Sequence, residues 1–250
     1  MTTPVDTVVR VGSVDLANPV MCASGTAGHG TELSPYLDLA SLGAFVVKSL
    51  SADPWPGNDA PRLIPTPAGM INSVGLQGPG VGAWIAGGCE DLRRAGVRRM
   101  VVSIWGRSVD DYGRAAEMLA AAPDEVVAVE VNLSCPNLDG GRHLFAHDPA
   151  LAAEVVGRAT ACGRPLWAKL SPNTDRLASV AAAVNDAGAE AVTLVNTYMG
   201  LRLDTESRRP ALGGGGGGVS GPAIHPLAVR AVYDCRAAHP DLPIIGVGGV

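Results

Sequence analysis

Short apolar runs alternate with longer amphipathic stretches along most of the chain. Seven runs rich in Val, Ile and Ala have the composition of buried parallel strands: Pro19–Ala23, Ala44–Leu50, Arg99–Trp105, Val126–Leu133, Pro165–Leu170, Ala191–Val195 and Pro243–Val247. Between them, helices are expected at about 31–42, 79–95, 109–122, 148–162, 174–187 and 223–238. This alternation predicts an α/β protein with a parallel sheet, and seven such strands favour a (β/α)8 TIM barrel.

The same pattern supplies one strand fewer than a complete barrel. The chain reaches Val250 directly after a GVGG turn. We therefore expect residues 1–250 to form a single, C-terminally incomplete barrel domain that lacks the eighth strand and the closing helices. Before the first run, residues 7–18 predict a β-hairpin. Segments 51–78 and 198–219 are longer than a connection requires, and for the glycines at 213–218 plain flexibility is favoured over a hinge or lid.

One of the apolar runs ends abruptly in polar residues. Residues 126–137 read VVAVEVNLSCPN, and Pro136 cannot continue a strand because it has no backbone donor and restricts the residue before it. Cys135 is therefore expected at the carboxyl end of a strand, where α/β barrels carry their active sites. A small buried cysteine in a loop is the alternative interpretation.

Composition narrows the class of ligand. The chain is 47% hydrophobic with a net charge of −5, which gives no general attraction to nucleic acid or anionic membranes, so a small-molecule site is expected. Five widely spaced cysteines without a CxxC pair indicate a reducing compartment and no zinc or iron–sulfur site of their own. A signal-like amino terminus and an apolar run of bilayer length are both missing, which favours a cytoplasmic protein.

Lysine is confined to two positions. Of the 19 Lys and Arg residues only Lys48 and Lys169 are lysines, and each ends an apolar run. This placement suggests that both sites need a compact ammonium group rather than a planar guanidinium. Chance would be the better explanation for either position alone.

Polar side chains gather where the expected strands end. The set comprises Ser24, Lys48, Ser49, Ser103, Asn132, Cys135, Asn137, Lys169, Asn196 and Thr197, with Asn72 from the loop after Lys48. Several amides suit a flat ligand with alternating C=O and N–H groups, such as a pyrimidine, and the thiol is the candidate for proton transfer. The GVGG turn and Ser220–Gly221 are each able to cradle a phosphate, although tight turns are the commoner explanation. The loop acids match no metal site.

These motifs resemble those of the dihydroorotate dehydrogenases in order and spacing. The matching segments are ASG (23–25), VVKS (46–49), NSVGLQGPG (72–80), VNLSCPN (131–137), AKLSPN (168–173), VNT (195–197), GGVSGPAI (217–224) and GVGG (246–249). Cys rather than Ser in the SCPN motif is similar to the class 1 enzymes. The NSVGLQGPG loop looks like that of the class 1B catalytic subunit.

The resemblance implies FMN-dependent oxidation of dihydroorotate to orotate in pyrimidine biosynthesis. It makes Cys135 the base that removes the C5 proton while hydride leaves C6 for the flavin. Implied substrate contacts are Lys48, Asn72, Val74, Gly75, Leu76, Asn132, Asn137, Asn196 and Thr197. Implied FMN contacts are Ala23, Ser24, Gly25, Lys48, Ser49, Ser103, Asn132, Lys169, Val195, Ser220, Gly221, Gly248 and Gly249, and no metal is implied.

The class 1B resemblance also implies partners. These are an electron-transfer subunit that carries FAD and a [2Fe–2S] cluster and passes electrons to NAD+, and a second copy of the chain in a homodimeric core. Two alternatives stay open. One is an FMN barrel that acts on another pyrimidine, as in dihydropyrimidine dehydrogenases, and the other is a non-catalytic ligand-binding barrel subunit.

Overall fold

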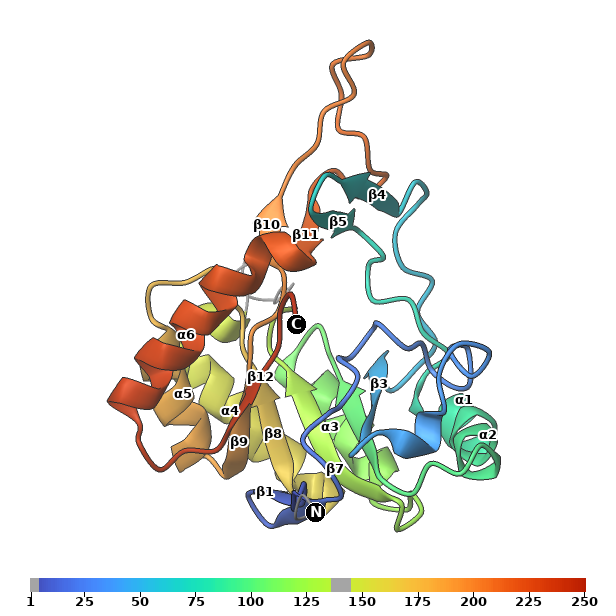
Figure 1. Ribbon diagram of the computed structural model, residues 1–250, viewed down its shortest axis with the longest axis vertical. Helices are drawn as coiled ribbons and strands as arrows, with labels where there is room; N and C mark the ends of the chain where they lie inside the picture. Colours follow the sequence, from blue (N-terminus) through green and yellow to red (C-terminus); the bar gives the residue numbers. More distant parts are fainter. Residues whose placement is uncertain (1–4, 136–144) are drawn as a thin grey trace.

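A six-stranded parallel sheet forms the centre of the computed structural model, which describes residues 5–135 and 145–250. Its strands lie side by side in chain order: β3 (Phe45–Leu50), β6 (Met100–Ile104), β7 (Val126–Asn132), β8 (Leu166–Lys169), β9 (Ala189–Leu194) and β12 (Ile244–Gly246). A parallel bridge between Met21 and Ala44 sets the expected first run beside β3. The parallel α/β sheet expected from the sequence is therefore confirmed, with its strands in barrel order (Figure 1).

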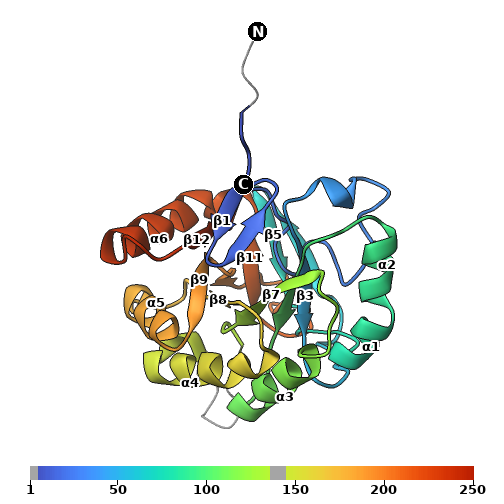
Figure 2. The ribbon, with the colours of Figure 1, turned by 90° about the horizontal axis from the view of Figure 1, so that it is seen from below.

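Helices cover the outer face of this sheet, as the view in Figure 2 shows. They are α1 (Val81–Ala86), α2 (Gly88–Arg94), α3 (Val109–Leu119), α4 (Pro149–Ala159), α5 (Leu177–Asp186) and α6 (His225–Ala238), with 3-10 turns at Leu39–Ser41, Phe145–His147, Thr160–Cys162 and Pro222–Ile224. The expected helix at 31–42 is wrong, because that segment forms turns and one 3-10 turn. Pro35 lacks a backbone donor, and Tyr36 is 86% exposed, so the segment has no continuous buried face.

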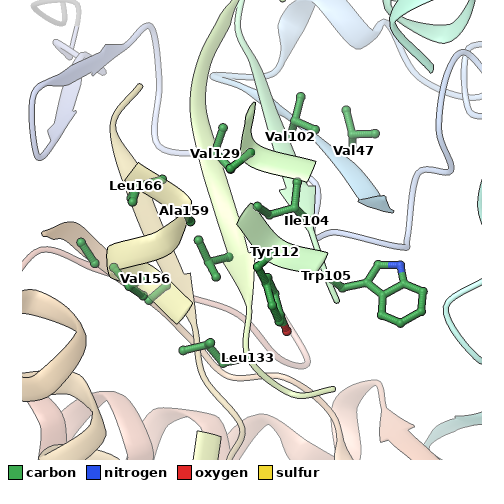
Figure 3. Packing of buried hydrophobic residues seen from close by; sticks show 14 of the residues in the cluster. Val47, Val102, Ile104, Trp105, Tyr112, Val129, Leu133, Val156, Ala159 and Leu166 are labelled. Carbon is green, nitrogen blue, oxygen red and sulfur yellow. The ribbon is translucent and has the colours of Figure 1, made fainter. Parts of the chain in front are cut away.

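Two apolar layers make up the core. Outward-facing strand residues such as Val47, Val102 and Val129 pack against the helices, as Figure 3 shows. Inward-facing residues, including Val46 and Trp167, form a smaller second cluster. The expected hairpin is present as β1 (Val9–Val11) and β2 (Val14–Leu16), and its Val14 and Leu16 join the inner cluster and close that end of the sheet.

Toward their carboxyl ends the strands change the character of their inward face. Along β7, Ala128 belongs to the inner apolar cluster, whereas Val129 and Val131 belong to the outer one. With the two-residue period of a strand, Glu130 and Asn132 then follow Ala128 on the inward face. The inward face of the sheet is therefore apolar toward the amino ends of the strands and carries polar groups toward their carboxyl ends.

A small antiparallel sheet stands beyond the carboxyl ends of the parallel strands (Figure 1). It consists of β4 (Leu63–Thr66), β5 (Gly69–Asn72), β10 (Tyr198–Gly200) and β11 (Gly217–Ser220), in the order β10-β11-β5-β4. The two long segments expected as loops thus pair with each other. Flexibility does not account for the whole glycine run, because a Cβ on Gly218 would collide with the side chain of Thr197.

In the ranges 5–135 and 145–250, no helix is long and apolar enough to cross a bilayer. The five cysteines are all free thiols.

Candidate active site

A chain of side-chain hydrogen bonds joins the carboxyl ends of the parallel strands. Ser49 is its centre: its hydroxyl lies 3.3 Å from that of Ser24 and 2.9 Å from that of Ser103. The Asn132 amide donates to the Ser49 hydroxyl over 3.2 Å. The Asn196 amide in turn donates to Oδ1 of Asn132 over 3.0 Å. Five side chains that the sequence placed at separate strand ends are therefore brought into one continuous polar array.

The orientation of the Asn132 amide is determined on both sides. Its Oδ1 accepts from the Ser134 backbone N–H at 3.2 Å as well as from Asn196, while its Nδ2 donates to Ser49. Asn196 is oriented too, since its Oδ1 accepts from the backbone N–H of Thr197 at 2.8 Å. A flat ligand with amide-like edges would meet donors and acceptors whose positions are already set.

Cys135 lies directly beyond this array and is almost completely buried, with 1% of its surface exposed. Its thiol donates to the backbone carbonyl of Asn132 at 3.5 Å. Burial raises the pKa of the thiol to about 12, although the nearby Tyr112 hydroxyl and the charge of Lys48 favour the thiolate and act in the opposite direction. The thiol is therefore protonated at neutral pH unless its surroundings change.

Lys169 ends strand β8, and Lys48 lies within β3 shortly before its end at Leu50, so both lysines lie near strand ends as the sequence predicted. Lys169 is 5% exposed, and Nζ of Lys48 lies close to Gly25. Burial, followed by repulsion from Lys169, lowers the pKa of Lys48, while Cys135 raises it. The two ammonium groups and the thiol thus act on one another across the same end of the sheet.

Residues of the segment 72–76 belong to the antiparallel sheet and the loop that leaves it. Asn72 ends β5, and its amide donates to the Gly218 carbonyl at 3.1 Å. Gly75 and Leu76 both have positive φ values, 71° and 61°. The Val74 carbonyl accepts from the backbone N–H of Asn58, and the Gly75 carbonyl accepts from the indole of Trp55, so this loop is anchored through its backbone.

Two glycine turns meet at the beginning of α6. Ser220 ends β11, and Gly221 and Gly249 have φ values of 97° and 73°. A Cβ on Gly249 would press against the Gly221 carbonyl oxygen and the backbone nitrogen of His225. The Gly248 carbonyl also lies 3.2 Å from Nδ1 of His225. Because both positions lack side chains, the two turns approach each other closely at a helix start, where backbone N–H groups are able to bind a phosphate.

The remaining expected positions have backbone roles or lie outside the description. Val195 is buried, and its N–H donates to Val247; Ala23 accepts from Thr26. Asn137 lies outside the described residues. Across 5–135 and 145–250, no group of His, Cys, Asp and Glu is arranged to hold a metal ion.

Two polar residues of the site escaped the sequence reasoning. Glu130 is 3% exposed, and one of its carboxylate oxygens accepts from Thr193 at 3.1 Å. The sequence does contain a signal for Glu130, because it is the single acidic residue in the Val-rich run 126–131. Tyr112 is fully buried in α3, and its hydroxyl donates to the Asn132 carbonyl at 2.6 Å. Its sequence position resembles that of any aromatic residue on the buried face of a helix.

Comparison with known proteins identifies the family that this chain resembles. The family model described as dihydroorotate dehydrogenase matches residues 7–250. A dihydroorotate dehydrogenase B (NAD(+)) catalytic subunit from Desulforudis audaxviator is 47% identical over 247 residues, which are 98% of this chain and 80% of the relative. Catalytic subunits of the same name from Geotalea daltonii and Pelobacter propionicus are 45% and 44% identical, each over 98% of this chain and 80% of their own length.

The match extends over the strands, the strand-end array and both glycine turns, and it agrees with the resemblance seen in the motifs. The chain belongs to the dihydroorotate dehydrogenase family.

Proposed function

We propose that this chain is the catalytic subunit of a class 1B dihydroorotate dehydrogenase, which oxidises dihydroorotate to orotate in pyrimidine biosynthesis. The observation that carries the proposal is the array of Ser49, Asn132 and Asn196 with Cys135 and two lysines at the same end of the sheet. The relatives align with 98% of this chain, and their names agree with this activity.

The residues present fit FMN. The glycine turns at Gly221 and Gly249, which have no room for a Cβ, bring backbone groups to the start of α6 for the phosphate. Ala23, Ser24, Gly25, Ser49, Ser103, Asn132, Val195, Ser220 and Gly248 complete the proposed contacts. Lys169, with Lys48, supplies positive charge for the flavin ring, where an ammonium stabilises negative charge. When bound, FMN supplies the acceptor for the hydride that leaves C6 of dihydroorotate.

The substrate is held by amides and backbone. Asn132 and Asn196 present fixed donors and acceptors. Asn72, Asn137 and Thr197 are further proposed substrate contacts. The backbone of Val74, Gly75 and Leu76 and the ammonium of Lys48 complete the proposed contacts. Lys48 gives the substrate carboxylate a charged partner.

Cys135 takes the proton from C5 of dihydroorotate. The reaction breaks one C–H bond at C5 and one at C6, and the proton and the hydride leave in different directions so that a C5=C6 double bond forms. Only the thiolate can accept the proton, so Cys135 must lose its own proton first. The positive charge of Lys48 favours that ionisation against the effect of burial.

Several finer features also belong to the proposal. We infer one (β/α)8 barrel domain, because the six parallel strands follow one another in barrel order and helices cover their outer face. A homodimer is supported by apolar residues exposed on the antiparallel sheet and on the segment 201–216, which connects β10 to β11: Met70, Met199, Leu201 and Leu203. The NAD(+) in the relatives' names supports an electron-transfer partner with FAD and a [2Fe–2S] cluster. The free thiols agree with a cytoplasmic protein.

The test is an anaerobic mixture of the purified, flavin-loaded protein with dihydroorotate, followed by the flavin absorbance. Bleaching is expected with wild type. Cys135→Ala should keep its flavin and lose nearly all bleaching at neutral pH. Cys162→Ala removes another buried thiol, distant in sequence, and should bleach normally. Reduction by dihydrouracil but not by dihydroorotate would favour another pyrimidine substrate, and a protein that cannot be loaded with flavin would contradict the proposal.

A further inference from the structure

The Asn132 carbonyl accepts two hydrogen bonds from side chains outside the polar array. The Tyr112 hydroxyl donates to it at 2.6 Å, and the Cys135 thiol donates to it at 3.5 Å. A carbonyl oxygen has two lone pairs, so both bonds can exist together. The phenol and the thiol are thus neighbours around one oxygen atom, at the point where β7 ends.

Tyr112 is held in this place from two sides. It lies on α3 with none of its surface exposed, and Phe145 packs edge-to-face on its ring with 5.3 Å between the centroids. The backbone N–H of Phe145 donates to the carbonyl of Cys135 at 3.3 Å, so the residue that fixes the phenol also fixes the backbone of the cysteine. In Figure 3 the Tyr112 oxygen is directed toward the segment of Leu133 that follows β7.

Ionisation of Cys135 changes what the thiol requires. The neutral thiol donates to the carbonyl, whereas a thiolate has no proton to donate and needs donors of its own. The Tyr112 hydroxyl can supply one by rotating about its C–O bond, with no movement of the ring. Burial raises the pKa of Tyr112 well above its ordinary value, so the phenol keeps the proton that it donates.

We propose that Tyr112 is a positioning residue for Cys135: it holds the neutral thiol beside the Asn132 carbonyl and donates its hydroxyl hydrogen to the thiolate when Cys135 ionises. The inference rests on the proposed role of Cys135 as the base. Other groups that act on this pair are Lys48 from β3, which favours the thiolate, and Asp111 from α3, which disfavours ionisation of the phenol.

The experiment compares Tyr112→Phe with wild type by the rate at which iodoacetamide alkylates Cys135, followed by mass spectrometry of the peptide that contains it. Below its pKa a thiol reacts in proportion to its thiolate fraction. Loss of the phenol donor should slow alkylation at fixed pH about tenfold or more, since hydrogen bonds to charged groups are among the strong ones. Tyr233→Phe, at a tyrosine that is 70% exposed on α6, is the control and should alkylate like wild type.

A purely structural role for Tyr112 predicts that Tyr112→Phe does not slow the alkylation of Cys135. If the hydroxyl only ties α3 to β7, its removal loosens the packing, and Cys135 becomes more accessible and reacts as fast as in wild type or faster. That result would overturn the proposal. A second readout is the pH profile of flavin reduction by dihydroorotate, which Tyr112→Phe should displace to higher pH by about one unit, the shift that corresponds to the tenfold change.

The two assignments fail separately. Normal flavin reduction by Cys135→Ala would remove the base role of Cys135 and leave the alkylation contrast as a measure of the Tyr112–Cys135 contact. Unchanged alkylation in Tyr112→Phe, with Cys135→Ala inactive, would remove the role of Tyr112 and leave the base in place.

Discussion

The Asn196 amide donates to Oδ1 of Asn132 over 3.0 Å and so connects the ends of β9 and β7 across the intervening strand β8. Because Asn132 also donates to Ser49, the amides are oriented by the protein before any ligand arrives. An array prepared in this way loses little conformational freedom when it binds a planar ring. The specificity of the site is therefore a property of the strand ends themselves.

Replacement of Asn132 by Ala should weaken both folding and ligand binding. It removes one of the partners of the Ser49 hydroxyl and the acceptor of the Asn196 amide, and an unsatisfied buried polar group costs about 1–3 kcal/mol. We expect the free energy of unfolding to fall by that amount and orotate affinity, measured from the perturbation of the flavin spectrum, to fall at least tenfold. Asn185→Ala, at an exposed asparagine of α5, is the control. Unchanged orotate affinity would contradict the assignment.

The rate of flavin reduction by dihydroorotate should rise with pH. The raised pKa of Cys135, about 12, leaves the thiol neutral at physiological pH, and each pH unit below the pKa changes the thiolate fraction tenfold. Stopped-flow measurements between about pH 6 and 9 should therefore show an increase of up to tenfold per unit. Cys162→Ala should give the same profile. A profile that does not change over this range would show that a group other than the thiol takes the proton.

The same pKa predicts how stability depends on alkaline pH. A thiol whose folded-state pKa is raised holds its proton more tightly when folded. Its contribution to stability is therefore complete below about pH 9 and is lost as the pH approaches about 12. Cys135→Ala lacks this contribution, so its loss of stability with pH, measured by urea denaturation, should be shallower than that of wild type.

Lys169→Met should lower the midpoint potential of bound FMN. In the proposed role of Lys169, its ammonium stabilises the negative charge of the reduced ring, and a charge-assisted hydrogen bond contributes about 1.5–3 kcal/mol. For a two-electron couple about 1.4 kcal/mol equals 30 mV, so a decrease of about 30 mV or more is expected in a dye-linked redox titration. Arg230→Met removes a positive charge from a side chain that is 74% exposed, and its potential should equal that of wild type. An equal potential for Lys169→Met would place that ammonium away from the ring.

Gly218→Ala should weaken substrate binding, whereas Gly157→Ala should raise the free energy of unfolding. A Cβ on Gly218 would collide with Thr197, so Gly218→Ala should displace this proposed substrate contact and raise the KM for dihydroorotate. Gly157 lies in α4 with open space where its Cβ would be, and Gly157→Ala should stabilise the protein by about 0.5–1 kcal/mol. Normal KM values for Gly218→Ala would show that the glycines of 213–218 serve flexibility after all.

Most of the fold could be predicted because each strand and helix carries its own local signal. The Val-rich runs and the Asp148–Pro149 helix start are local, and α4 begins at Pro149 with the Asp148 carboxylate accepting from the Ala150 N–H. The antiparallel sheet could not be predicted, because β11 pairs with a strand about 146 residues away in the chain and its glycines read as a loop. The expected helix at 31–42 failed because amphipathic spacing does not reveal whether a partner surface exists.

The site was predictable wherever its residues end a strand. Lys48, Asn132 and Lys169 follow apolar runs, and strand direction alone brings them together. Tyr112 shows the limit of this reasoning. It reaches the Asn132 carbonyl from a helix outside the sheet, and a contact of this kind depends on packing that periodicity does not encode.

The antiparallel sheet has a consequence for the order in which the molecule assembles. Asn72 of β5 and Gly218 of β11 are 146 positions apart in the chain, and closing so long a loop is entropically unfavourable until the parallel strands hold its ends together. We therefore expect the antiparallel sheet to form last during folding and to open first during unfolding. In native-state hydrogen exchange, the amides of β5 and β11 should exchange earlier than those of β6 and β7.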